Sequence, residues 1–85
     1  MSEVIVTFKV MPTGVEVDLS KLENDIRQKI SPQRVTQEPV AFGLVALIVT
    51  TLVDDAEGTL EKVESALRSI ENVNEVEVTE MTRSI

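Results

Sequence analysis

The N-terminal segment alternates between apolar and polar side chains. Because successive side chains of a strand point to opposite faces of a sheet, this period of two predicts a strand over residues 3–11 with one buried face. The segment Met11-Pro12-Thr13-Gly14 then ends the alternation. The apolar positions expected on the buried face are Val4, Val6, Phe8 and Val10.

A helical period follows Asp18, whose carboxylate is placed to cap a helix. Ser20 and Glu23 have the spacing of a capping box, a second signal for a helix N-terminus. We expect Ser31-Pro32 to end this helix, because the residue before a proline is disfavoured in the α region. The apolar residues at helical spacing are Leu19, Leu22, Ile26 and Ile30.

Two strands are expected on either side of the turn Glu-Pro-Val-Ala-Phe-Gly at residues 38–43. The shorter strand runs from about Arg34 towards Pro39, and because proline cannot donate to a ladder, we expect it at a sheet edge. The longer strand runs from Leu44 to Val53 with apolar side chains on both faces, which is typical of a central strand.

The last third of the chain predicts a second helix and a fourth strand. Three carboxylates within residues 54–57 are expected where the helix begins, because its N-terminal dipole favours negative charge. Asn72 suits a left-handed position after the helix, and Val76 and Val78 are expected on the inward face of the last strand. The apolar stripe of the helix comprises Leu60, Val63, Ala66, Leu67 and Ile70.

The element order is therefore βαββαβ, within one domain over residues 1–85. With two right-handed crossovers, this order predicts the ferredoxin-like split βαβ fold of the α+β class, a four-stranded antiparallel sheet with both helices on one face. The other face is open, and there we expect an apolar patch of Ile5, Val45, Leu47 and Val49. Such a patch is either an interaction surface or covered by a loop or a second copy of the chain.

Composition narrows the class of partner. The formal net charge of −7 repels a phosphate backbone, so we expect no direct nucleic-acid binding; it suits a basic protein partner or simply keeps a small protein soluble and monomeric. The longest apolar stretch, Val40 to Val49, is shorter than the roughly 20 residues of a membrane-spanning helix. The absence of cysteine fits a reducing interior, so we expect a cytoplasmic protein.

The residues for enzymatic chemistry are missing from this sequence. It has no histidine, cysteine or tyrosine to serve as base or nucleophile, and no glycine-rich phosphate loop, so we expect neither an enzyme nor a cofactor. Asp54, Asp55 and Glu57 lack the spacing of a calcium loop, and the helix dipole explains them without a metal. We therefore expect a protein that acts by binding a macromolecular partner.

Two further positions are open to more than one interpretation. Phe42 is an aromatic side chain in a turn beside glycine, and it either contacts a partner or folds back onto the edge of the core. Arg83 is the one basic residue of the segment 82–85, which we expect to follow the last strand; terminal residues are usually frayed, so position alone does not distinguish it.

Four segments together carry a resemblance to a known family. They are Val-Thr-Phe-Lys-Val-Met-Pro at 6–12, Glu-Val-Asp-Leu at 16–19, Pro-Val-Ala-Phe-Gly-Leu-Val-Ala-Leu at 39–47 and Asp-Asp-Ala-Glu-Gly at 54–58. Over essentially its whole length the chain resembles the archaeal translation elongation factor 1-beta family, most specifically in the third segment. The resemblance implies a βαββαβ domain that promotes exchange of GDP for GTP on the GTPase elongation factor 1-alpha.

The resemblance also implies which residues contact the GTPase. Eukaryotic relatives use a Gly-Phe-Gly or Gly-Tyr-Gly turn; Phe42 and Gly43 match its last two positions, and Ala41 replaces the first glycine. The same relatives carry a next-to-last lysine that disturbs the magnesium and phosphate end of the nucleotide site. Here that position is Ser84, and the nearest cation is Arg83.

Two other functions are compatible with the fold class. A regulatory or assembly module would use the open sheet face to dimerise or to line a small-molecule effector site. Such a module would be a stable dimer indifferent to the GTPase, whereas the exchange factor is expected to be a monomer. A small hydrolase such as an acylphosphatase would need an arginine after the first strand, and Pro12-Thr13-Gly14-Val15 contains none.

Overall fold

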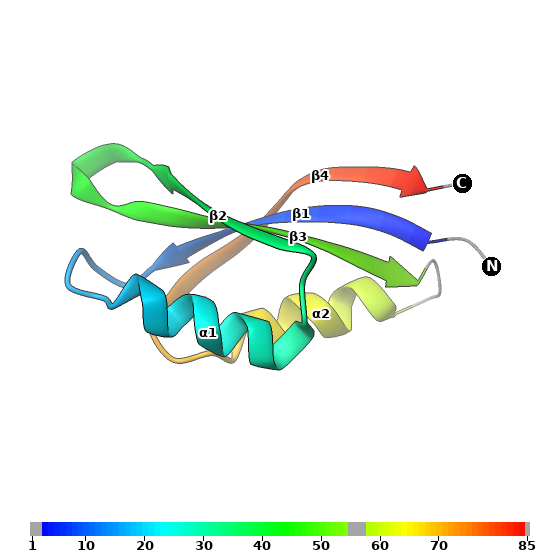
Figure 1. Cartoon of the computed structure of the whole chain (residues 1–85), viewed down its shortest axis with the longest axis horizontal. Coiled ribbons are helices and arrows are strands. Elements are labelled where there is room, and N and C mark those ends of the chain that lie inside the picture. Colours follow the sequence, from blue (N-terminus) through cyan, green and yellow to red (C-terminus); the bar gives the residue numbers. More distant parts are fainter. Residues whose placement is uncertain (1–2, 55–57, 85) are drawn as a thin grey trace.

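The computed structural model describes residues 3–54 and 58–84, and within them it has the predicted ferredoxin-like architecture. The strands pair antiparallel in the order β2-β3-β1-β4, and both helices cover the same face of the sheet (Figure 1). The edge position of β2 and the inner position of β3 confirm the two strand assignments. The elements are β1 (Glu3–Pro12), α1 (Leu19–Ile30), β2 (Arg34–Pro39), the 3₁₀ turn η1 (Ala41–Gly43), β3 (Val45–Asp54), α2 (Thr59–Arg68) and β4 (Val73–Ser84).

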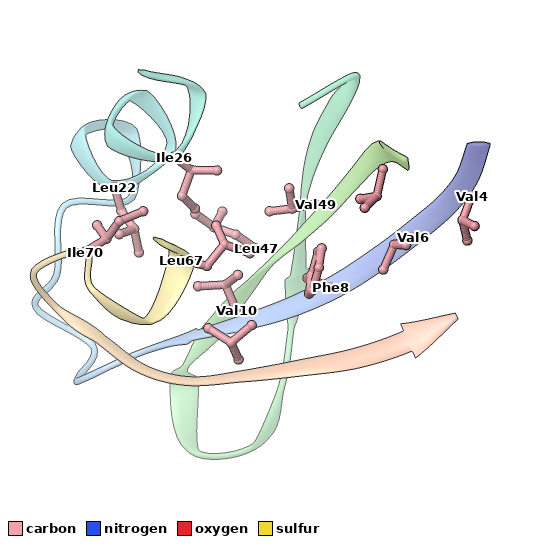
Figure 2. Close-up of a cluster of buried hydrophobic side chains, with 12 residues drawn as sticks. Val4, Val6, Phe8, Val10, Leu22, Ile26, Leu47, Val49, Leu67 and Ile70 are labelled. Carbon is pink, nitrogen blue, oxygen red and sulfur yellow. The ribbon is translucent and has the colours of Figure 1, made fainter. Parts of the chain in front are cut away.

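One hydrophobic core lies between the sheet and the two helices (Figure 2). Phe8 is fully buried in β1, and it shares this core with Ile26 of α1 and Leu67 of α2. The alternation predicted for β1 is confirmed, because its even-numbered positions are buried and its odd-numbered positions are not. The rest of the buried cluster is Val4, Val6, Val10, Leu22, Leu47, Val49, Val53, Ile70 and Val76.

Asp18 caps α1 as predicted. Its carboxylate accepts hydrogen bonds from the backbone amides of Ser20, at 3.0 Å, and Lys21, at 3.2 Å. The helix therefore begins at Leu19, so Ser20 lies inside the first turn and is not the cap of a Ser20–Glu23 capping box. The helix ends at Ile30, as expected, with Ser31 in the left-handed region at φ 48°.

We expect the Asp18→Ala variant to lose about 1 kcal/mol of folding free energy, because two amides of the first turn lose their acceptor. Urea denaturation measures this loss. The matched control is Asp25→Ala, which removes only an exposed ion pair with Lys21 and should cost less than about 0.5 kcal/mol. Equal losses in the two variants would contradict the capping role.

The predicted apolar patch on the open face is wrong in three of its four members. The register pairs odd-numbered residues of β1 with even-numbered residues of β3, for example Ile5 with Leu52, and directly paired residues share a face. Leu47 and Val49 lie opposite buried residues of β1 and belong to the core, and Val45 shares their face. The apolar side chains that share the open face with Ile5 are Met11, Ala46, Ile48 and Leu52.

Polar side chains cover part of this open face. The Lys9 ammonium of β1 lies 4.0 Å from the Glu38 carboxylate of β2, so the pair reaches across the intervening strand β3. Glu38 lies opposite Ala46, whose short side chain leaves room for this contact and is itself fully buried. The open face is therefore less apolar than the sequence pattern suggests.

The second half of the chain follows the prediction with shifted boundaries. Asp54 is the last residue of β3, and the prediction that Asp55 and Glu57 lie at the helix N-terminus concerns positions outside the described residues. Helix α2 begins at Thr59. Asn72 is left-handed, at φ 75°, in the turn before β4.

Neither helix of the described chain is long and apolar enough to cross a membrane.

Candidate functional site at the two ends of the sheet

The structure places the predicted contact residues in two groups at opposite ends of the sheet. Residues 41–43 form the turn between β2 and β3, beyond the pair Val10–Leu47, whereas Arg83 lies at the other end of β1, opposite Val4. In Figure 1 the turn is at the left and the C-terminus at the right of the long axis. The molecule extends 41 Å along this axis, so one partner that touches both groups must span the domain.

Backbone hydrogen bonds hold the Ala41–Gly43 turn in a defined shape. The Val40 amide donates to the Leu44 carbonyl at 2.8 Å, and the Leu44 amide donates to the Ala41 carbonyl at 3.3 Å. Within this closed turn, Phe42 adopts φ 63° and ψ 29°, in the left-handed region. Its side chain is 94% exposed, so the interpretation that Phe42 folds back onto the core edge is wrong.

This conformation of Phe42 is unfavourable for the isolated protein. A non-glycine residue in the left-handed region costs roughly 1–2 kcal/mol, and phenylalanine has no polar side chain to offset that cost as asparagine does. Full exposure also leaves its large apolar surface in water. Strained and exposed apolar residues are typical of binding sites, where the partner supplies the missing contacts.

The other two residues of the turn, Ala41 and Gly43, have small side chains. Gly43 lies at φ 76°, and a methyl group there would meet only Val15 Cγ1 at an ordinary 3.7 Å. The backbone conformation, and not a lack of space, therefore favours glycine at this position. Ala41 is exposed, and its carbonyl accepts the Leu44 amide that closes the turn.

At the opposite end, Arg83 belongs to a strand and not to a frayed tail. Strand β4 continues to Ser84, whose backbone lies opposite Glu3, so the expectation that residues 82–84 follow the last strand is wrong. The antiparallel pairing fixes the backbone of Arg83 opposite Val4. Its exposed side chain therefore starts from a defined position at the end of the sheet.

A β-bulge in β4 decides which face Arg83 occupies. Phe8 lies opposite Val78, and the next residue of β1, Thr7, lies opposite Glu80, so Thr79 is an extra residue in the ladder. The Thr79 hydroxyl donates to the Thr7 carbonyl at 3.3 Å. Beyond the bulge Arg83 falls opposite the buried Val4, on the face that carries the helices.

The bulge also separates the charges of β4. Glu75 and Glu77 lie opposite odd-numbered residues of β1, and the extra residue brings Glu80 onto the same open face. Arg83 is the one basic residue of this strand and points to the other face. The cation is thus kept apart from the three carboxylates of its own strand.

Among the described residues, no group of three acidic side chains is close enough to hold a metal ion.

Sequence reasoning did not single out Val15, which the structure places beside the Phe42 turn. Val15 lies in the connection between β1 and α1 and is 66% exposed, and its Cγ1 faces Gly43. The signal in the sequence was an apolar residue directly after Gly14, within a short polar connection.

Comparison with known proteins agrees with the resemblance. Residues 5–83 match the family described as the EF-1 guanine nucleotide exchange domain. Elongation factor 1-beta of Methanothermobacter thermautotrophicus is 44% identical over 98% of both chains, and that of Methanosphaera stadtmanae is 44% identical over the same shares. Elongation factor 1-beta of Methanococcoides burtonii is 41% identical over the full length of both chains. The chain therefore belongs to the EF-1 guanine nucleotide exchange domain family, a family of nucleotide exchange factors and not of enzymes.

Proposed function

We propose that this chain binds elongation factor 1-alpha and promotes the exchange of GDP for GTP on that GTPase. The observation that carries the proposal is Phe42, 94% exposed in a strained and hydrogen-bonded turn, within a chain of the exchange family. Phe42 is the apolar anchor of the complex. The turn is already ordered in the free protein, so binding does not have to order it.

Exchange follows from reciprocal coupling between two ligands of one GTPase. The chain binds the nucleotide-free GTPase more tightly than the GDP-bound form. Its binding must therefore lower the affinity of the GTPase for GDP by the same factor. No bond is made or broken in this step. The exchange factor therefore needs contacts that differ between the two states of its partner, and it needs no catalytic side chain.

The two ends of the domain have separate tasks in this proposal. Phe42, at the β2–β3 turn, supplies affinity, and Arg83, at the end of β4, disturbs the magnesium and phosphate end of the nucleotide site by its positive charge. A guanidinium is always charged and competes electrostatically with a cation. Because the two groups lie at opposite ends of a molecule 41 Å long, they contact different parts of the GTPase.

The domain acts on this partner as a cytoplasmic monomer, without nucleic acid, membrane or cofactor. A net charge of −7 opposes association of two copies and binding to a phosphate backbone. Light scattering after size exclusion should show one copy alone and a one-to-one complex on addition of the GTPase. A stable dimer that ignores the GTPase would instead support the regulatory-module function.

The proposed activity is tested by the release of fluorescent GDP from purified archaeal elongation factor 1-alpha in excess unlabelled nucleotide. We expect acceleration that rises with the concentration of this protein and saturates, because release then occurs from a bound complex. An unrelated GTPase with the same fluorescent nucleotide is the control and should not respond. Absence of acceleration with a GTPase that binds and releases GDP normally would overturn the proposal.

A further inference from the structure

Two exposed apolar side chains lie at the same end of the domain. Among the described residues, the large apolar side chains with substantial exposure are Val15 at 66%, Phe42 at 94%, Leu52 at 36% and Met81 at 52%. Val15 and Phe42 belong to neighbouring connections, since Val15 Cγ1 lies 3.7 Å from the Cβ position at Gly43. Figure 1 shows the β1–α1 connection and the β2–β3 turn at the same end of the molecule.

Both side chains are presented by hydrogen-bonded turns. The Val17 amide donates to the Gly14 carbonyl at 3.4 Å, which makes Val15 the second residue of a four-residue turn. Phe42 is the central residue of the turn closed by Val40 and Leu44. Neither apolar side chain therefore depends on a loose loop for its position.

We propose that Val15 and Phe42 form one apolar tip that enters a single apolar recess on elongation factor 1-alpha, so that the β1–α1 connection is a second contact segment. This proposal rests on the proposed function. Within residues 13–17 and 40–44, Glu16 is the one charged side chain, so the matching surface is apolar and not an acidic or basic patch. Val15 is then a specificity contact that extends the anchor beyond the aromatic ring.

The GTPase is a better occupant of this tip than a second copy of the chain. Two side chains and their turns bury far less than the roughly 1,200 Å² of a stable protein interface. Each copy also carries a net charge of −7, which opposes self-association. The tip alone is therefore too small for a stable interface and must be part of a larger one. The proposed complex with the GTPase provides it, because the partner also contacts Arg83 at the other end of the 41 Å long domain.

The test is the affinity of Val15→Ser for nucleotide-free elongation factor 1-alpha by titration calorimetry. We expect binding about tenfold weaker, because the apolar surface of one valine no longer leaves water on binding. The matched control is Leu52→Ser, an exposed apolar side chain on the open sheet face, and we expect a change below about twofold. Thermal unfolding should be close to wild type in Val15→Ser, whose side chain is 66% exposed, and lower in Leu52→Ser, whose side chain is 36% exposed, so both affinities are measured well below the lower unfolding temperature.

A double-mutant cycle with Phe42→Ala tests whether the two side chains share a recess. Coupled side chains are expected to give a combined loss that differs at least about threefold from the product of the single losses. A Val15→Ser affinity equal to that of Leu52→Ser, or strictly multiplicative losses, would overturn the shared tip and leave the proposed function standing. Failure of the wild-type chain to bind the GTPase would overturn both.

Discussion

Replacing Phe42 by alanine is expected to weaken binding to elongation factor 1-alpha by about ten- to a hundredfold, which is the range of an aromatic hot spot. The reason is geometric, because the side chain is almost fully exposed in the free chain and its apolar surface becomes buried only in the complex. Calorimetric titration of the nucleotide-free GTPase gives the loss in affinity. In the GDP-release assay the variant should need more protein for half-maximal acceleration, whereas its maximal rate should change little.

The same position predicts opposite effects on binding and on stability. Phe42→Gly relieves the strain of a non-glycine residue at φ 63°, so we expect the free protein to become more stable by up to about 1 kcal/mol while binding weakens about as much as in Phe42→Ala. Urea denaturation and calorimetry on the same preparation measure both effects. Phe8→Ala is the matched control, since Phe8 is fully buried and its truncation should cost about 3–5 kcal/mol. Wild-type affinity in Phe42→Ala would refute the anchor.

The architecture was predictable because its strongest sequence patterns are local. Alternation in β1 identifies its buried face, and the capping carboxylate of Asp18 marks the start of α1 before any tertiary contact is known. The open face was not predictable, because it depends on register. Whether Ile5 shares a face with Val49 or with Leu52 is decided by a shift of one residue between strands, and a strand with two apolar faces does not reveal that shift.

The position of the β2–β3 turn was predictable from the sequence, but its conformation was not. A turn with glycine is expected between β2 and β3, but the sequence does not show that Phe42, and not only Gly43, takes a positive φ. The bulge at Thr79 is also absent from any periodic pattern, because threonine suits a regular strand equally well. With every residue of β4 present, the bulge at Thr79 is what puts Arg83, and not Thr82, opposite Val4.

The corrected open face also weakens the case for the regulatory-module function. That function rested on an apolar patch, and two of the side chains assigned to it, Leu47 and Val49, are in the core. The face instead carries a salt bridge between Lys9 and Glu38 across β3. Dimerisation through it would cover the carboxylates of Glu75, Glu77 and Glu80, which share this face, and the net charge of −7 on each copy opposes that contact.

The second large effect is expected at Arg83, where the rate of release should change more than affinity. We expect Arg83→Ala to lower the maximal GDP-release rate by about ten- to a hundredfold, the usual range for a lost charge-assisted contact. The concentration for half-maximal acceleration should change little, since the apolar anchor at the other end of the domain is intact. Arg83→Lys, which keeps the charge, should retain most of the rate. Substitution is a cleaner test than truncation, because residues 82–84 pair with β1.

Whether Arg83 must lie on the face that carries the helices is tested by moving the arginine to the other face without removing it. An alanine inserted between Thr82 and Arg83 turns the arginine to the open face, since each added residue reverses the side-chain direction in a strand. We expect this insertion to lower the maximal rate as Arg83→Ala does, although every charge is still present. Deletion of Thr79 is the control, because it removes the extra residue but preserves the pairs from Thr7–Glu80 to Val4–Arg83, so most of the rate should remain. If the insertion kept the wild-type rate, a positive charge near the end of the sheet would suffice, and the face that Arg83 occupies would have no part in exchange.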